Sequence, residues 1–207
     1  MDLQLLSDPI TKAQKLEVVP VSEVKRDLRI THGDDDASIG DDIEAAYDYL
    51  AGPEGWLGHC SLLEEEWELY LPAGVGRTFE LPMRPLVGAQ LSGFGYLVDG
   101  VYEDVVTDHY FIRPAAGLFA SVGYATGRPW PYVAAGVQRG YRLRFKTGFG
   151  TTKESIPSGI RKSIRLLAGH WNKAREAASD EGAVAGQEIP FGLRSLCGRY
   201  RISPDHS

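Results

Sequence analysis

The stretch that decides the fold is residues 157–178, which read PSGIRKSIRLLAGHWNKAREAA. Its apolar side chains recur in steps of three and four residues, at Ile160, Ile164, Leu167, Trp171, Ala174 and Ala178. This spacing places them on one face of a helix, and Pro157 suits the first turn, where its missing N–H is not needed. The pattern predicts one long amphipathic helix, which requires an apolar partner to cover its stripe.

Two shorter helical patterns lie near the N-terminus. Residues 22–28 begin with Ser22, which can cap a helix, and place Val24 and Leu28 on one face. A second helix opens at Asp34–Asp36, whose carboxylates suit the positive end of a helix dipole, and it ends at Gly52-Pro53. The apolar stripe of this second helix is Ile39, Ile43, Ala46, Tyr47 and Leu50. Because a short helix cannot bury its stripe alone, we expect both to pack with the long helix.

Between these helical patterns the sequence period changes to two. Trp67, Leu69 and Leu71 alternate with polar residues, which is typical of a half-buried strand. Further strands are predicted over 78–81, 86–91, 96–98, 101–105, 108–112, 118–122 and 141–146, with a hairpin turn at Asp99-Gly100. Residues 123–140 are too rich in glycine and proline, and too many, for a tight turn, so they are predicted to form a long loop.

The fold class that follows from these patterns is α+β. We expect residues 1–61 and 148–207 to form one helical bundle from the N- and C-terminal helices. Residues 62–147 are then an antiparallel β-domain inserted between the two halves of the bundle.

The composition argues against tight nucleic-acid binding, membrane contact and a disulfide framework. The 207 residues include 22 Lys+Arg and 28 Asp+Glu, a net charge of −6, so the chain lacks the cationic surface that tight nucleic-acid binding needs. No apolar run approaches the roughly 18 residues of a spanning helix, and no leader pattern opens the chain, so we expect a cytoplasmic protein without membrane contact. Cys60 and Cys197 are far apart in sequence and are predicted to be free thiols.

No residue cluster has the pattern of a catalytic, cofactor or metal site. Asp34–Asp36 are consecutive, unlike the ligands of a calcium loop, and are expected to open a helix. Glu64–Glu66 and Glu68 are interpreted as an acidic, solvated strand edge. No nucleophile signature surrounds His59-Cys60, and no nucleotide-binding motif occurs. The sequence therefore predicts no enzyme, no cofactor and no metal.

An ordered set of short motifs resembles one protein family. The motifs are SEVKRDLRI (22–30), the Asp34–Asp36 helix start, WEL (67–69), LPMRPL (81–86), FKTGFG (145–150), LAGHW (167–171), IPFGL (189–193) and Tyr200-Arg201. With these motifs, which span most of its length, the chain resembles the head-to-tail connector proteins, also called adaptors, of long-tailed phages and gene transfer agents.

The resemblance implies a structural, non-enzymatic role. Such proteins form a ring of about twelve copies between the portal and the stopper or tail, and DNA passes through the lumen without tight or specific binding. The implied location is the host cytoplasm during assembly and the particle neck at maturity. The C-terminal segment of family members commonly docks on the portal, a role that the resemblance assigns here to Arg194, Arg199, Tyr200 and Arg201.

A ring also requires contacts between copies, made by two different faces of each subunit. The default interpretation of the cationic face of the long helix is a solvated face. The alternatives are an acidic protein partner or a neighbouring copy, and then nucleic acid; one candidate pairing brings Arg161, Lys162 and Arg165 of one copy to acidic residues of the next. The candidate acids are Asp41, Asp42 and Glu44.

The long loop carries two aromatic residues, Trp130 and Tyr132. They either anchor a neighbouring copy or the stopper, or they cover the β-core.

Three alternatives to the connector are kept: a stopper or tail-completion protein of the same neck, an enzyme acting on cell-wall glycan, and a monomeric ligand-binding β-module. The enzyme requires paired carboxylates in a cleft, and the β-module predicts no ring.

Overall fold

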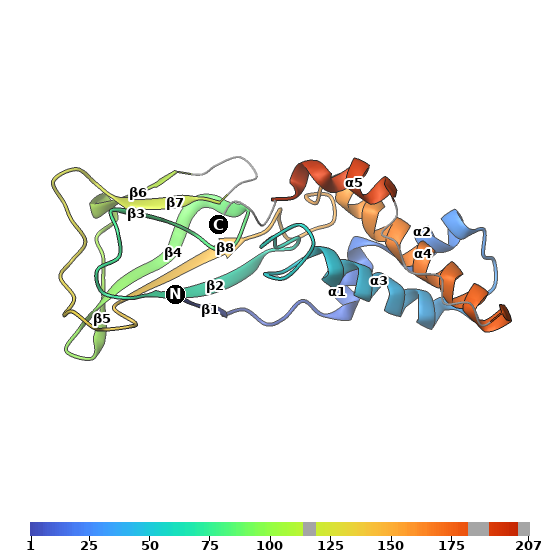
Figure 1. Cartoon of the computed structure of the whole chain (residues 1–207), viewed down its shortest axis with the longest axis horizontal. Helices are drawn as coiled ribbons and strands as arrows, with labels where there is room; N and C mark the ends of the chain where they lie inside the picture. The colour runs from blue at the N-terminus through green and yellow to red at the C-terminus, as the bar shows by residue number, and fades with distance from the viewer. Residues whose placement is uncertain (114–118, 182–190, 203–207) are drawn as a thin grey trace. The chain divides into compact units, whose positions relative to one another are not determined.

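The long helix predicted from residues 157–178 is present as α4 (Ser158–Glu181), in a computed structural model that describes residues 1–113, 119–181 and 191–202. It packs against α3 (Asp36–Leu50) and α2 (Val21–Leu28), and α3 also packs against α1 (Lys12–Val18). Figure 1 shows α3 and α4 side by side. With α5 (Phe191–Cys197) and the 3₁₀ turn η2 (Gly198–Tyr200), these elements form a helical unit from Ile10–His59 and the described part of Thr151–Ser207.

The apolar stripe of α3 and the first half of the α4 stripe are buried as their spacing predicts, whereas Trp171 and Ala174 of α4 are half-buried. Along α4, Ile160, Ile164 and Leu167 are at most 1% exposed, and the whole predicted stripe of α3 is buried. The start of α2 differs from the prediction, since Pro20 occupies the N-cap position and Ser22 lies inside the helix without capping it. No helix among the described residues combines the length and apolar character needed to cross a membrane.

Helix α1 was not predicted, and a capping box explains why it forms. The Gln14 N–H donates to Thr11 Oγ1 at 3.3 Å, and the Thr11 N–H donates to Gln14 Oε1 at 2.8 Å. These two bonds satisfy donors that would otherwise be free at the helix start. The helix has seven residues, too few for a periodic apolar pattern to stand out in the sequence.

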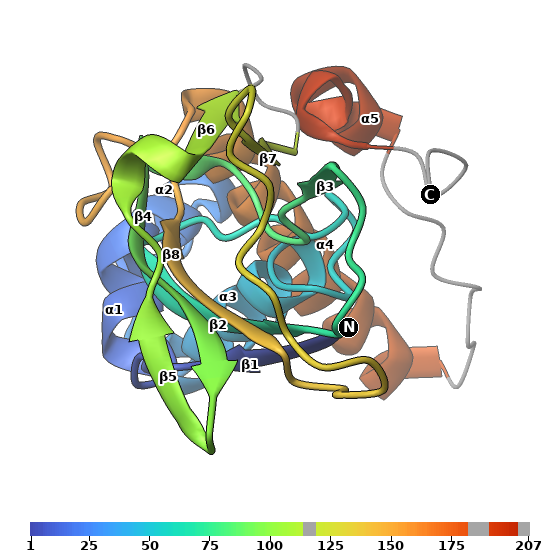
Figure 2. The same cartoon turned by 90° about the vertical axis from the view of Figure 1, so that its left-hand side faces the viewer.

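The remaining elements build a β-rich unit from Met1–Pro9 and Cys60–Gly150. Its five-stranded antiparallel sheet has the order β1-β2-β8-β4-β5, and a three-stranded antiparallel sheet has the order β3-β7-β6 (Figure 2). The strands of the larger sheet are β1 (Asp2–Leu5), β2 (Glu65–Leu71), β8 (Tyr141–Thr147), β4 (Leu86–Val98) and β5 (Val101–Asp104). Those of the smaller sheet are β3 (Thr78–Glu80), β7 (Ser121–Tyr124) and β6 (Tyr110–Arg113), the last preceded by the 3₁₀ turn η1 (Thr107–His109).

The core of the β-rich unit gathers side chains of both sheets, among them Leu69, Phe94, Val122, Leu143 and Phe145. The predicted alternation in β2 and β8 is confirmed, because their apolar residues are buried and the cations of β8 lie on the other face. The α+β class with antiparallel sheets is therefore confirmed. The Asp99-Gly100 hairpin is confirmed too, since it joins the paired strands β4 and β5 with both residues in the left-handed region.

Two features of the larger sheet differ from the sequence prediction. Residues 2–5, which we assigned to the helical part, form strand β1, and Leu3 and Leu5 pack on the β-core opposite Leu69 and Trp67. Segments 86–91 and 96–98, predicted as separate strands, belong to the single strand β4. A register shift with left-handed backbone at Gly88 and Ala89 interrupts its pattern, so the alternation is lost locally.

Candidate interaction surfaces

Charge is distributed unevenly within the helical unit. Residues 10–59 hold 5 Lys+Arg against 11 Asp+Glu, a net −6, whereas residues 151–207 hold 9 against 6, a net +3. Helices α3 and α4 bring these two segments together. The unit therefore has an acidic part and a basic part on different elements, which is the kind of asymmetry that head-to-tail contacts use.

The acidic residues predicted for contact between copies are already engaged within the chain. Lys12 of α1 is ion-paired with Asp41 and, at 3.7 Å, with Glu44. Lys15, only 7% exposed, lies 3.4 Å from Glu44 and 2.7 Å from Asp48. These pairs fasten α1 to α3, so their carboxylates have a function inside the subunit.

Two cations of α4 are engaged in the same way. Arg165 grips Asp27 of α2 through two guanidinium nitrogens, Nε at 3.0 Å from Oδ2 and Nη2 at 2.6 Å from Oδ1, and its Nη1 donates to Glu23 at 3.3 Å. Arg175 lies 3.5 Å from Asp42. Burial raises the pKa of Asp42, although the charge of Arg175 acts in the opposite direction. The two arginines thus join α4 to α2 and α3.

The other predicted interface cations have no such partner. Arg161 donates from Nε to the Ile156 carbonyl at 3.2 Å, and Lys162 is exposed. Within the described ranges, neither makes an ion pair with a carboxylate; the same holds for the exposed Lys173 of the same helix. Lys162 and Lys173 are therefore exposed cations of α4 without an ion pair in the described ranges, whereas Arg161 is half-buried and its charge acts on the Glu154 carboxylate.

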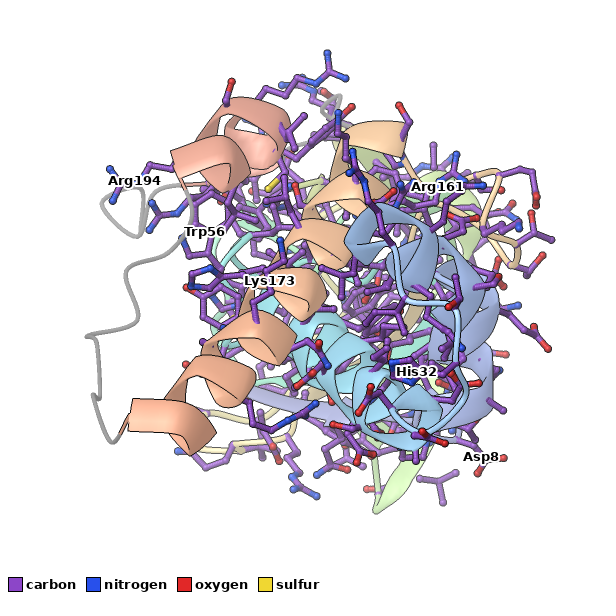
Figure 3. All side chains as sticks on the ribbon, turned by 90° about the vertical axis from the view of Figure 1, so that its right-hand side faces the viewer. Asp8, His32, Trp56, Arg161, Lys173 and Arg194 are labelled. Atoms are coloured by element: carbon purple, nitrogen blue, oxygen red, sulfur yellow. The ribbon has the colours of Figure 1, made fainter. Side chains whose placement is uncertain are left out.

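The residues that the family resemblance assigns to the portal lie at the C-terminal end of the helical unit. Arg199 stacks on Tyr200 at 4.7 Å, and Arg201 stacks on Trp56, also at 4.7 Å from the ring centre. Next to Arg201, the Ile202 N–H donates to the Leu57 carbonyl at 3.1 Å, which ties the segment to the loop after α3. In Figure 3, Arg194 and Trp56 lie on the α5 side of α4, and His32 lies on the opposite side.

All three arginines of this segment are exposed, and none has a carboxylate within ion-pair distance in the described part of the chain. The guanidinium groups of two of them, Arg199 and Arg201, lie over aromatic rings, so they are positioned in advance. The segment can therefore offer cations to an acidic surface at low cost in side-chain entropy.

An open hollow of about 460 Å³ lies beside this segment, with Tyr49 and Trp56 in its wall. A second hollow of about 320 Å³ lies along α2, lined by Lys25, Arg26 and Asp36 among others. The wall of the first hollow, beside Trp56, also includes Asp48 and Glu54, as that of the second includes Asp36. Carboxylates therefore form part of both walls.

The outer face of the five-stranded sheet carries a charge network that the sequence did not reveal. Glu68, predicted to be solvated, is 7% exposed because β2 lies between β1 and β8 rather than at an edge. Its carboxylate accepts from Tyr70 Oη at 2.5 Å and from Arg144 Nε at 2.8 Å, with Arg142 at 3.9 Å. Burial alone would raise the Glu68 pKa, but these hydrogen bonds and charges outweigh it and lower the pKa. A lowered pKa is the opposite of what a general acid requires.

The long loop separates its two aromatic residues. Trp130 donates from Nε1 to the Gly76 carbonyl at 2.8 Å and packs edge-on against Phe94 and Tyr124, so it covers the β-core. Of the two roles expected for Trp130, its contacts favour the cover of the β-core. Tyr132, two residues on, is 85% exposed. An irregular loop has no repeating period that assigns each side chain to a buried or an exposed face. The sequence therefore could not distinguish Trp130 from Tyr132.

The described residues contain no group of three or more His, Cys, Asp or Glu side chains arranged to hold a metal ion. Cys60 and Cys197 are buried, unpaired thiols, as predicted, and burial raises the pKa of Cys60 to about 11. His59, beside Cys60, has left-handed backbone. A thiol with such a pKa is protonated at neutral pH and is a poor nucleophile.

Solved structures with the same fold come from gene transfer agent (GTA) particles. A chain in the neck of an empty GTA particle, computed with C6 symmetry, has a TM-score of 0.71 and 23% identity. A chain in the virion of a native GTA particle gives 0.71 and 22%, and one in the neck of a native GTA particle, computed with C12 symmetry, gives 0.66 and 19%. Each match covers 98% of this chain and 96% of the other. No protein-family model matches the sequence, and no curated protein is significantly similar to it. Over nearly its whole length, the chain therefore shares the fold of chains from GTA particles, including two from the particle neck.

Proposed function

We propose that this chain is a structural subunit of the neck of a gene transfer agent or long-tailed phage particle. More specifically, it is a head-to-tail connector, or adaptor, that forms a ring of about twelve copies between the portal and the stopper or tail. The observation that carries the proposal is the fold shared over 98% of the chain with necks computed under C6 and C12 symmetry. We propose further that the helical unit is a bundle of both chain ends with the β-rich unit inserted.

The charge distribution supports a ring built from identical copies. A ring contact joins two different faces of the same chain, and the helical unit has a net −6 segment and a net +3 segment. Neither Arg161 nor Lys162 makes an ion pair among the described residues, although the charge of Arg161 acts on the carboxylate of Glu154, so they are the strongest candidates for the basic side of the contact. Arg165, Asp41, Asp42 and Glu44 would have to exchange or share their present partners.

The net charge supports a conduit for DNA. Each phosphate bound by a cation adds a salt-dependent attraction that opposes passage of the duplex. With a net charge of −6, the subunit has a surplus of acidic groups. On the sheet face, moreover, Arg144 and Lys146 of β8 are paired with Glu68 and Glu64 at 2.8 and 2.9 Å, and Arg142 lies 3.9 Å from the same Glu68, so most of the positive charge of this strand is already compensated. DNA can then pass through the lumen without being retained.

The portal is the proposed partner of the C-terminal segment. Arg194, Arg199 and Arg201 are exposed, and two of them are stacked on the rings of Tyr200 and Trp56. In this proposal the three arginines face acidic groups of the portal. The subunit would be made in the host cytoplasm and located in the neck of the finished particle, and no catalytic role is assigned to it.

Electron microscopy and native mass spectrometry of the purified chain, alone and mixed with its portal, test the function. The expected result is a closed ring of about twelve copies seated on the portal. Replacing Arg161 and Lys162 together with glutamate should reduce ring formation, whereas Lys173→Glu on the same helix is the matched control. A chain that stays monomeric with the portal present, or that is absent from the neck of purified particles, contradicts the proposal.

A further inference from the structure

The hollow at the C-terminal end of α3 has a wall that is held in place by the chain itself. Tyr49 and Trp56 belong to this wall, and the Trp56 N–H donates to the Tyr49 carbonyl at 2.8 Å. The ring of Tyr49 also packs edge-on against Trp171 of α4, with 6.1 Å between the ring centres. Between them, Gly55 lies so close to Ala51 that a Cβ there would be 2.2 Å from the Ala51 carbonyl oxygen. The hollow is therefore formed before any partner arrives.

One carboxylate of this wall has no cation paired with it. Asp48 lies 2.7 Å from Lys15, whereas Glu54 is exposed and makes no ion pair within the described ranges. The acidic residues of α3 that we considered for contact between copies are all paired inside the subunit. Glu54 can therefore pair with a cation of another molecule without giving up a present partner.

Apolar surface beside the Glu54 carboxylate suits a lysine side chain. The methylene stem of a lysine can pack on the rings of Tyr49 and Trp56 while its ammonium group meets Glu54. Arg201, which is outside the wall, shows that Trp56 accepts a cation, since its guanidinium lies 4.7 Å from the ring centre. A purely apolar side chain would instead remove water from Glu54 without a compensating bond.

The chain itself has a lysine that fits this description. Lys162 of α4 is exposed and makes no ion pair in the described part of the chain. Arg161 precedes it, so two positive charges fall at one place, whereas the sequence neighbours of Lys173 are uncharged. Figure 3 shows Trp56 and Arg161 on opposite sides of α4. A ring contact joins two different faces of the same chain, and the hollow and the Arg161–Lys162 pair meet this condition.

We propose that the hollow of one copy, lined by Tyr49, Glu54 and Trp56, receives Lys162 of the next copy in the ring. The hollow belongs to the acidic segment 10–59, and Lys162 belongs to the basic segment 151–207, so the two faces are complementary in charge. The inference rests on the proposed ring and names the acidic side of its contact. That side is a hollow formed in advance, in place of the α3 carboxylates that are already paired.

Carbodiimide crosslinking of assembled rings tests the inference. The reagent joins a carboxylate to a lysine amine only where the two groups touch, and it leaves a direct amide bond between them. Rings are assembled on the portal from a mixture of copies with natural and heavy isotopes, and crosslinked peptides are identified by mass spectrometry. We expect a peptide that joins Glu54 to Lys162 and combines the two isotope forms, because the bond connects two copies.

The unassembled chain, treated in the same way, is the control and should give no peptide of mixed isotopes. Rings that lack the Glu54–Lys162 peptide, or that join Glu54 to Lys173 instead, overturn the inference while leaving the neck function intact. Failure of the unmodified chain to form rings with its portal contradicts the neck function itself.

Exchange of the two charges gives a second measurement, the chain concentration at which half of the portal carries a ring. Glu54→Lys should raise this concentration at least about tenfold, because two ammonium groups then face each other. Glu17→Lys is the matched control at an exposed carboxylate of α1 without an ion pair in the described ranges, and it should change the concentration less than about twofold.

Glu54→Lys combined with Lys162→Glu should restore assembly to within about threefold of the unmodified chain, because opposite charges face each other again. Circular dichroism of each variant checks that the subunit is folded. Equal effects of the two single substitutions, or no recovery in the folded double variant, overturn the inference.

Discussion

Replacing Glu68 with glutamine tests whether burial, rather than distance, sets the contribution of an ion pair on the β-sheet. The pairs Arg144–Glu68 and Lys146–Glu64 have almost the same separation, 2.8 and 2.9 Å. They differ in their surroundings, since the side chain of Glu68 is 9% exposed and that of Glu64 is 23% exposed. Glu68 also accepts a hydrogen bond from Tyr70, which gives it a second, uncharged donor.

The expected loss in the free energy of unfolding depends on the hydrogen bonds that Glu68 loses and on the hydration that its arginine partners recover. Glutamine keeps the size of Glu68 but loses charge-assisted hydrogen bonds, each worth about 1.5–3 kcal/mol in a buried setting. Arg144 and Arg142 are 41% and 29% exposed and recover part of their hydration, so we expect a net loss of about 2 kcal/mol in the free energy of unfolding. Glu64→Gln should leave the unfolding midpoint unchanged, because Lys146 stays in water.

Urea denaturation followed by tryptophan fluorescence measures both variants. Trp67 lies next to Glu68 in β2 and is buried, so this sheet contributes to the signal of the four tryptophans. The pKa of Glu68 lies below its ordinary value of 4.5, so the folded carboxylate binds its proton less readily than the unfolded one. Its stabilising effect is therefore present above pH 4.5 and is lost as the pH falls through the lower, folded pKa. Equal losses for the two variants at neutral pH would refute the reasoning.

Three further outcomes are expected. Arg165→Gln should lower the stability of the helical unit by about 1 kcal/mol in urea denaturation, because the clamp on Asp27 is lost, whereas Lys162→Gln should have no effect; equal effects would contradict the clamp. Trp130→Ala should cost about 3 kcal/mol and lower the thermal midpoint, since a ring packed on the β-core is removed; an unchanged midpoint would contradict its supporting role. Cys60, with its raised pKa, should react with a thiol reagent at pH 8 only after unfolding, so rapid reaction of the native protein would contradict its burial.

Local periodicity predicts the elements whose pattern is long enough to be read. Helix α4 and strands β2 and β8 repeat their apolar spacing over seven residues or more, so position in the sequence fixes which face is buried. Strand β1 has four residues and is defined by its pairing with β2, in which Leu3 lies opposite Leu69. Because the pairing partner is remote in sequence, no local sequence pattern predicts strand β1.

The error at Glu68 has the same origin. Alternation correctly separates the two faces of β2, but it does not tell which neighbouring strands cover the strand on either side. Glu68 lies opposite Gln4 of β1 and Arg144 of β8, and its carboxylate is bonded to Arg144 and to Tyr70 of its own strand. The burial of a charged side chain thus depends on the order of strands in the sheet, which the sequence pattern leaves undetermined.

Helix α1, which the sequence did not predict, changes which carboxylates are available for ion pairs between copies. Without it, the carboxylates of α3 look free, and pairing them with Arg165 of another copy is attractive. With it, Lys12 and Lys15 already neutralise Asp41 and Glu44 inside the subunit. A contact that breaks existing surface pairs to form similar ones gains little, since each such pair contributes about 0–1 kcal/mol. The cations with most to gain are those with no carboxylate partner in the described ranges, such as Lys162 of α4. A ring contact that uses Lys162 breaks no existing ion pair on its basic side, so charge reversal at this residue should weaken assembly without lowering the stability of the subunit.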